Sequence, residues 1–205
     1  MKKNKNLNQY LKKRNRDLFF TQSKIQGYRS RSAFKLLEMN NKFKILKNDS
    51  KILDLGSFPG GWSQVASKII DEGKILAVDI KPMEEIKNVD FINGDFFDDE
   101  IHKRISDYFK NKADIVLSDM AANTSGNKDM DSFRTGELCM KSMELAKKIL
   151  IRDGVFLSKI FMGSIFSEID DKANKYFKKV IKHKPLSSKK ESKEIYIYCK
   201  GVLKI

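Results

Sequence analysis

The chain of 205 residues has little of several residue types that hold small proteins or metal sites together. It contains only two cysteines and two histidines, too few for a disulfide framework or a zinc cage, so we expect no metal site. No apolar run approaches the roughly 18 residues that a membrane span needs. The charged N-terminus lacks the apolar segment of a secretory signal. These absences predict a cytoplasmic protein that contacts no membrane.

Internal repeats are also missing, as are linkers rich in glycine, serine or proline. The length fits one domain, and the 40% of hydrophobic residues can build one core. We therefore expect a basic N-terminal extension at residues 1–30 and a single domain at 31–205. No large apolar helix face is left over, which favours a monomer.

What the chain has in excess is positive charge, concentrated at its two ends. It has 41 basic and 27 acidic residues, a net charge of +14. Residues 1–35 carry +10 and residues 172–205 carry +9, so the segment between them is mildly acidic. This segregation predicts one basic face, made by residues 1–35 and the lysines of 172–193, for a polyanion such as RNA. Solvated termini in a lysine-rich protein are the alternative.

From about residue 51, short apolar runs rich in β-branched residues alternate with longer helical patterns. Such alternation predicts a mostly parallel sheet covered on both faces, a Rossmann-like three-layer α/β sandwich. Only a loop joins the last two of the seven predicted strands, so we expect an antiparallel pair at one edge. The predicted strands are 51–55, 74–80, 89–93, 114–119, 154–161, 178–183 and 194–200. The predicted helices are 31–41, 61–71, 98–110, 132–151 and 164–176.

A glycine-rich loop and two acids follow the first three strands. In open α/β sheets, ligands bind beyond the carboxyl ends of the strands. Asp79 is placed to accept hydrogen bonds from ribose hydroxyls, and Asp95 from an adenine amino group. The pattern predicts a nucleoside-containing cofactor, although neither a Walker A sequence nor the G-x-G-x-x-G fingerprint is present. Spacing alone leaves NAD and S-adenosylmethionine open. The predicted binding residues are Gly60, Gly61, Trp62, Asp79 and Asp95.

Several blocks, in one order, resemble the FtsJ-type ribose 2′-O-methyltransferases. The resemblance covers residues 27–200 and is strongest to the bacterial enzymes that methylate a uridine ribose in large-subunit ribosomal RNA. It implies S-adenosylmethionine as cofactor, and ribosomal RNA or the large ribosomal subunit as partner. The blocks are YRSRSAFKL at 28–36, LDLG at 53–56, PGGWSQ at 59–64, SDMA at 118–121, LSKIF at 157–161 and SKEIY at 192–196.

The Lys–Asp–Lys–Glu tetrad of this family falls on Lys35, Asp119, Lys159 and Glu194. A ribose hydroxyl must lose its proton as it attacks a methyl group. An ordinary lysine, with a pKa of about 10.4, is protonated near neutrality, so a lysine base needs burial or a second ammonium nearby. The resemblance makes Lys159 the proton acceptor and Lys35 a source of positive potential. Asp119 would orient Lys159 and contact the cofactor, and Glu194 would hold the lysines in register.

The chain departs from the family at Phe58, where a small residue is usual, and at Ala122, which replaces a proline. Three other functions compete with the leading one. An NAD-linked oxidoreductase would need the dinucleotide fingerprint that is missing. A non-catalytic RNA-binding relative would have no reason to keep all four tetrad residues. Methylation of another RNA, a tRNA or a cap-like end, would use the same tetrad.

Overall fold

The computed structural model describes residues 18–110, 112–122, 125–189 and 191–203. Every predicted strand and helix is present, and their ends differ from the predicted ones by a few residues. Residues 18–25 form an additional helix, whereas the role expected for residues 1–17 lies outside the described part. The elements are α2 (Ala33–Phe43), β1 (Lys51–Leu55), α3 (Gly61–Ser67), β2 (Lys74–Asp79), β3 (Asp90–Asn93), α4 (Asp99–Phe109), β4 (Ala113–Ser118), α5 (Lys128–Ile149), β5 (Leu150–Phe161), α6 (Phe166–Tyr176), β6 (Phe177–His183) and β7 (Glu194–Val202).

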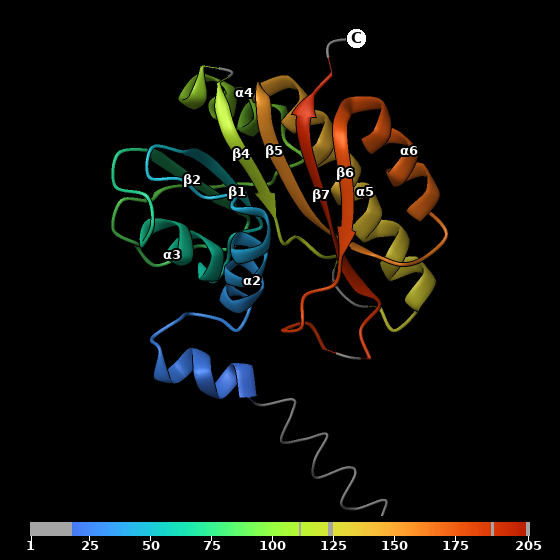
Figure 1. Ribbon diagram of the computed structural model, residues 1–205, viewed down its shortest axis with the longest axis horizontal. Coiled ribbons are helices and arrows are strands. Elements are labelled where there is room, and N and C mark those ends of the chain that lie inside the picture. The colour runs from blue at the N-terminus through green and yellow to red at the C-terminus, as the bar shows by residue number, and fades with distance from the viewer. Residues whose placement is uncertain (1–17, 111, 123–124, 190, 204–205) are drawn as a thin grey trace, which may run out of the picture.

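The seven strands form one sheet in the order β3-β2-β1-β4-β5-β7-β6. The strands from β3 to β5 are parallel, and β7 is antiparallel to both β5 and β6. The predicted antiparallel pair at the edge is therefore confirmed. The reversed strand is β7, one position inside the sheet, and β6 is the edge strand. In Figure 1, β7 points the opposite way to its neighbours.

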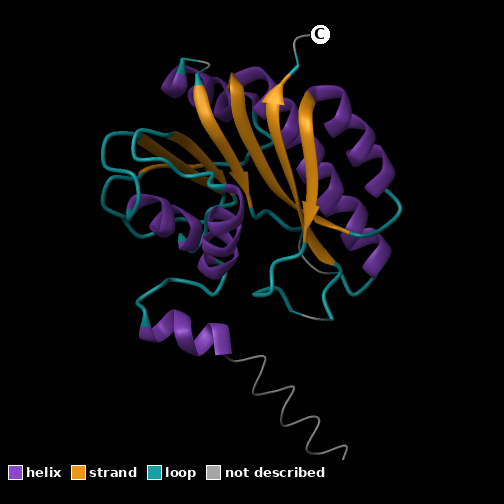
Figure 2. Cartoon of the chain, in the orientation of Figure 1, coloured by secondary structure: helices purple, strands orange, loops and turns teal. Residues whose placement is uncertain are grey.

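Helices cover both faces of the sheet, as the apolar strands predict. On one face α2 and α3 pack against a core that includes Leu36, Trp62 and Leu157. On the other face α4, α5 and α6 enclose a second core around Ile105, Met143 and Phe156. The three layers are visible in Figure 2. The inner strands are buried on both sides, and this explains why their sequences are almost continuously apolar, whereas the edge strands β3 and β6 are largely exposed.

In the sheet, β1 lies between β2 and β4, so the chain first continues to the neighbour on one flank of β1 and later returns to the neighbour on its other flank. The loops after β1 and β4 therefore open beside each other, at the topological switch point where ligands bind in such sheets. Gly56 lies where the two loops meet, with φ of 70°. A Cβ atom there would lie 2.3 Å from Cγ of Met120, so only glycine fits.

The predicted basic face is only partly assembled. The loop between β6 and β7 packs against the segment before α2, because the Arg31 guanidinium donates a hydrogen bond to the Ser187 carbonyl at 2.7 Å. The prediction is wrong for the lysines of α6, which lies on the opposite face of the sheet from α2. One of them, Lys172, is paired with Glu144 of α5. Sequence position could not reveal this, because the side of a crossover helix is set by the sheet topology.

Among the described residues, no helix combines the length and the apolar character that crossing a membrane requires.

Candidate active site

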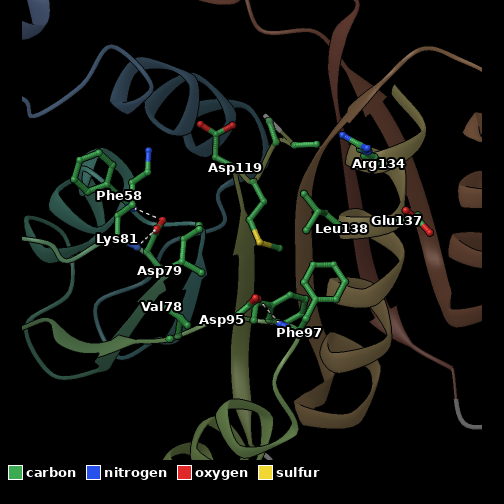
Figure 3. A pocket seen from close by; sticks show the side chains of 17 residues that line it. Phe58, Val78, Asp79, Lys81, Asp95, Phe97, Asp119, Arg134, Glu137 and Leu138 are labelled. Carbon is green, nitrogen blue, oxygen red and sulfur yellow. Dashed lines mark hydrogen bonds between the residues drawn. The ribbon is translucent and has the colours of Figure 1, made fainter. Parts of the chain in front are cut away.

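A pocket of about 590 Å³ opens at the carboxyl edge of the parallel strands. The ends of β1, β2, β3 and β4 form its floor, and the first turns of α5 form one wall (Figure 3). Phe58, Ile80 and Phe97 give the pocket apolar sides. Its lining also includes the carboxylates of Asp79, Asp95, Asp119 and Glu137. The bulky Phe58 side chain thus lines the cavity instead of turning into the core. An elongated ligand with both apolar and cationic parts fits this lining.

Two of the predicted cofactor-binding acids, Asp79 and Asp95, lie in this pocket (Figure 3). Asp79 accepts hydrogen bonds from the backbone N–H groups of Phe58 at 2.9 Å and Lys81 at 2.8 Å. Asp95 accepts one from the N–H of Phe97 at 2.9 Å. A carboxylate has about four acceptor positions, so both acids are held in place and can still accept hydrogen bonds from a ligand.

The other three predicted cofactor residues lie behind the pocket, and none of them lines it. Trp62 is 2% exposed and belongs to the core beside α2. Its ring N–H donates to the carbonyl of Ser32 at 2.9 Å. At Gly61 an added Cβ would lie 2.2 Å from Oγ of Ser30, and Gly60 has φ of 105°. In this structure these residues shape the loop and anchor it to the segment before α2.

All four tetrad residues come together at one end of the pocket, in two ion pairs. Nζ of Lys159 lies 2.9 Å from Oδ1 of Asp119, and also donates to the Asp119 carbonyl oxygen. Nζ of Lys35 lies 2.8 Å from Oε1 of Glu194. The four side chains are only 8–17% exposed. Charges this buried are stable only when paired, so the fold holds each lysine in a defined position.

Tyr196 links the two pairs and was not singled out from the sequence. Its hydroxyl donates a hydrogen bond to Oδ1 of Asp119 at 2.7 Å. The Lys35 ammonium lies 5.6 Å from the centre of its ring, close enough for a cation–π interaction. The signal was present in the strand pattern, because Glu194 and Tyr196 are two residues apart and so share one face of β7. Its significance required the register that pairs Tyr196 with Lys159 on β5.

Comparison with known proteins identifies the family. The model of the FtsJ-like methyltransferases matches residues 28–202. The chain belongs to this family. A protein from Pelagibacter ubique named "Ribosomal RNA large subunit methyltransferase E" is 49% identical over 200 residues, 98% of each chain. A crystal structure titled as a ribosomal RNA methyltransferase from Plasmodium falciparum is 33% identical, with a TM-score of 0.76, and covers 86% of this chain and 99% of its own.

A third likeness concerns the fold alone. A Streptococcus mutans protein solved in complex with SAH is 14% identical, with a TM-score of 0.54, over 82% of this chain and 97% of its own. The Rossmann-like architecture expected for an FtsJ-like methyltransferase is confirmed.

The charge on Asp119 of this FtsJ-like methyltransferase is set by opposing effects. Burial works to raise the pKa of the carboxyl group, but the ammonium groups of Lys159 and Lys35 lower it. The hydrogen bonds from Tyr196 and Lys159 act in the same direction, and the net result is a pKa below the ordinary value. Asp119 is therefore a carboxylate at neutral pH, and it also lines the pocket. It is the one residue shared by the pocket and the tetrad.

A second layer holds the tetrad from the side of β7. The Ser188 hydroxyl donates to Oε1 of Glu194 at 2.7 Å. The loop carrying Ser188 is tied to α2, where Glu38 accepts hydrogen bonds from the N–H groups of Leu186 and Ser187 at 2.7 and 3.2 Å. Because Lys35 is also on α2, these bonds hold both partners of the Lys35–Glu194 pair. Sequence reasoning missed Ser188 and Glu38, because neither role is visible before the loop is folded against the helix.

Asp54, near the carboxyl end of β1, is a further acid that sequence reasoning left without a role. Burial and, less strongly, the nearby carboxylates of Asp119 and Asp79 raise its pKa to about 7, against a hydrogen bond from Ser63. That bond measures 2.6 Å and uses one oxygen. The other oxygen, Oδ1, is buried and has no hydrogen-bond partner among the described residues.

The described residues contain no group of three or more histidine, cysteine or acidic side chains that could hold a metal ion.

Proposed function

We propose that this protein transfers a methyl group from S-adenosylmethionine to the 2′-hydroxyl of a uridine ribose in large-subunit ribosomal RNA. The observation that carries the proposal is the position of Asp119, which lines the pocket and also pairs with a buried lysine. A cofactor bound in the pocket and a ribose hydroxyl bound at Lys159 would therefore both lie next to the Asp119 carboxylate. The printed name of the relative from Pelagibacter ubique supports ribosomal RNA as the substrate.

The lining of the pocket fits S-adenosylmethionine. Asp79 and Asp95 can accept hydrogen bonds from ribose hydroxyls and an adenine amino group, and the apolar sides suit an adenine ring. The carboxylates of Asp79, Asp95 and Asp119, at the ends of β2, β3 and β4, favour a cationic ligand. Gly60, Gly61 and Trp62 would take part through the backbone of the loop, since the Trp62 side chain is buried in the core and a Cβ at Gly61 would meet Ser30. When bound, S-adenosylmethionine supplies an electrophilic methyl group.

Each tetrad residue has a definite task in this reaction. The ammonium of Lys159 that pairs with Asp119 must first release a proton to solvent. In its neutral form Lys159 then accepts the proton of the ribose hydroxyl, which turns a poor nucleophile into an alkoxide. The Asp119 carboxylate holds Nζ of Lys159 and stabilises the ammonium that forms. Lys35 supplies a positive charge that stabilises the developing alkoxide. Glu194 holds Lys35, and Tyr196 holds Asp119, so both act as positioning residues.

The RNA would lie across the loop 184–193 and the segment around Arg31, whose basic side chains face phosphates. The basic extension at residues 1–30 adds further positive charge beside a single catalytic domain at 31–205, and the enzyme acts as a monomer in the cytoplasm. Binding through phosphates would weaken steeply as salt is raised, because counterions are released.

Transfer of a labelled methyl group tests this function. Purified protein is mixed with labelled S-adenosylmethionine and either naked ribosomal RNA or large subunits from cells that lack the modification, and ribose methyl groups are then mapped. We expect one 2′-O-methyluridine in the large-subunit RNA. Label on a base, on tRNA alone or on a nucleotide other than uridine would overturn the assignment.

A further inference from the structure

Three large apolar side chains are exposed on α5 and just after β5, in segments that also carry pocket and tetrad residues, and α5 covers the face of the sheet opposite α2. Met130 and Phe133 of α5 are 48% and 47% exposed, and Met162, just after β5, is 43% exposed. Isolated apolar residues on a surface are normal, but a group of them beside a site indicates a binding surface. We call Met130, Phe133 and Met162 the apolar rim.

The fold brings these residues together through a contact between α5 and the end of β5. The buried Ser132 hydroxyl donates to the carbonyl of Phe161 at 3.3 Å. A Cβ atom added to Gly163 would lie 2.1 Å from Oγ of Ser132, so the two segments touch. Phe133 follows Ser132, and Met162 lies between Phe161 and Gly163, so both flank this contact. Met130 is three residues before Phe133 and shares its face of the helix.

The apolar rim is close to the reacting centre. Met162 is three residues beyond Lys159, at most about 11 Å of extended chain. The N–H of Met162 donates to the carbonyl of Lys193, the residue before Glu194, at 3.1 Å. Arg134, next to Phe133, lines the pocket (Figure 3). The tetrad therefore lies between a basic side, made by α2 and the loop 184–193, and an apolar side.

We propose that the apolar rim receives an unstacked nucleobase of the RNA, at or next to the nucleotide whose ribose reaches Lys159. The proposal rests on the proposed function and deepens it. A ribose presented to a buried lysine must leave regular stacking, and this exposes the face of a base. Base faces are the apolar surface that RNA offers, and they stack on aromatic rings regardless of sequence.

The proposal assigns phosphate contacts to the basic side and base stacking to the apolar rim. The basic side would bind phosphates, and its contribution would fall with salt. The apolar rim carries no charge of its own, so its contribution would change little with salt. The two sides can therefore be distinguished by the salt dependence of binding.

The test compares Phe133→Ala with Phe133→Tyr, which keeps the ring, and with Ile151→Ala as control. Ile151 is 38% exposed, but it lies at the start of β5, at the opposite edge of the sheet. The substrate is a fragment of the large-subunit RNA with 2-aminopurine next to the target nucleotide. Loss of one stacked base predicts a Kd and a KM raised roughly 5- to 150-fold in Phe133→Ala. The slope of log Kd against log salt and the affinity for S-adenosylmethionine stay as in wild type.

The fluorescence of 2-aminopurine should be quenched by wild type and by Phe133→Tyr, and much less by Phe133→Ala. Equal RNA affinity and quenching in wild type and Phe133→Ala would overturn the proposal, as would an equal loss in Ile151→Ala. A defect seen only with assembled subunits and not with naked RNA would place a ribosomal protein on the rim and would also overturn it. The binding measurements need no methyl transfer, so failure of the proposed function, seen as a wild-type protein that transfers no methyl group, remains distinguishable.

Discussion

The tetrad and the pocket adjoin each other, but their charged side chains have different partners. In the tetrad, both lysines and both acids find a charged partner within the chain. In the pocket, the bonds that Asp79 and Asp95 accept from described residues come from backbone N–H groups, and their other acceptor positions stay available to a ligand. The tetrad is thus complete without a ligand, whereas a ligand completes the pocket. Substitutions in the two regions should therefore affect different steps.

The largest effect is expected at Lys159, which belongs to the tetrad alone. Lys159→Arg should lower the single-turnover rate of methyl transfer about 10²- to 10⁴-fold, because a guanidinium keeps its proton and cannot act as a base. Affinity for S-adenosylmethionine, measured by calorimetry, should be nearly unchanged, because Lys159 does not line the pocket. A near-wild-type rate would show that Lys159 only positions the substrate.

A substitution of Asp54, the buried acid of β1, tests how unfavourable its negative charge is in the folded protein. Its raised pKa, about 7, means that the folded state binds a proton more tightly than the unfolded state does. The stability this provides is complete below about pH 4 and is lost as the pH rises to about 7. The loss amounts to at most about 4 kcal/mol.

Asp54→Asn should remove this loss, since an amide does not titrate. Urea unfolding of ligand-free wild type and variant between pH 4 and pH 8 measures the difference. Parallel pH profiles for the two proteins would mean that Asp54 stays ionised in the fold. Other titrating groups contribute equally to both profiles and cancel in the comparison.

Asp95 belongs to the pocket alone and should give the converse of the Lys159 result. Asp95→Ala should weaken binding of S-adenosylmethionine by about 1–3 kcal/mol, because a donor of the ligand loses its acceptor. At saturating cofactor the single-turnover rate should recover toward that of wild type. An affinity equal to that of wild type, in both this variant and Asp79→Ala, would remove the two acids from the cofactor site.

An indirect effect is expected at Tyr196, whose hydroxyl positions Asp119. Tyr196→Phe keeps the ring beside Lys35 and removes one hydrogen bond to a carboxylate, a loss of about 1.5–3 kcal/mol at most. We expect a modest fall in the methyl-transfer rate and a cofactor affinity within a few-fold of wild type. A loss as large as that of Lys159→Arg would give the hydroxyl a direct part in proton transfer.

The sequence was sufficient to predict the seven strands, the helices from α2 to α6 and the three layers, because the inner strands are buried on both faces and therefore read as apolar runs. The helix at 18–25 was not predicted. Residues with local signals were also found. Asp79 and Asp95 follow strands, and the tetrad residues lie in blocks that resemble the family. The assembly of Asp79, Asp95 and Asp119 at one edge of the sheet followed from the parallel topology. The cofactor and RNA roles of these residues remain predictions.

Only the tertiary structure decided which groups are partners. The insertion of β7 between β5 and β6 places Tyr196 opposite Lys159, and the fold of the loop 184–193 against α2 brings Ser188 to Glu194. The burial of Trp62 and the raised pKa of Asp54 are likewise absent from local patterns. Hydrophobic periodicity indicates which residues of a strand or helix face the core. Ion pairs, hydrogen bonds and pKa values depend on atoms brought within a few ångströms by segments far apart in the chain, and no local pattern specifies those distances.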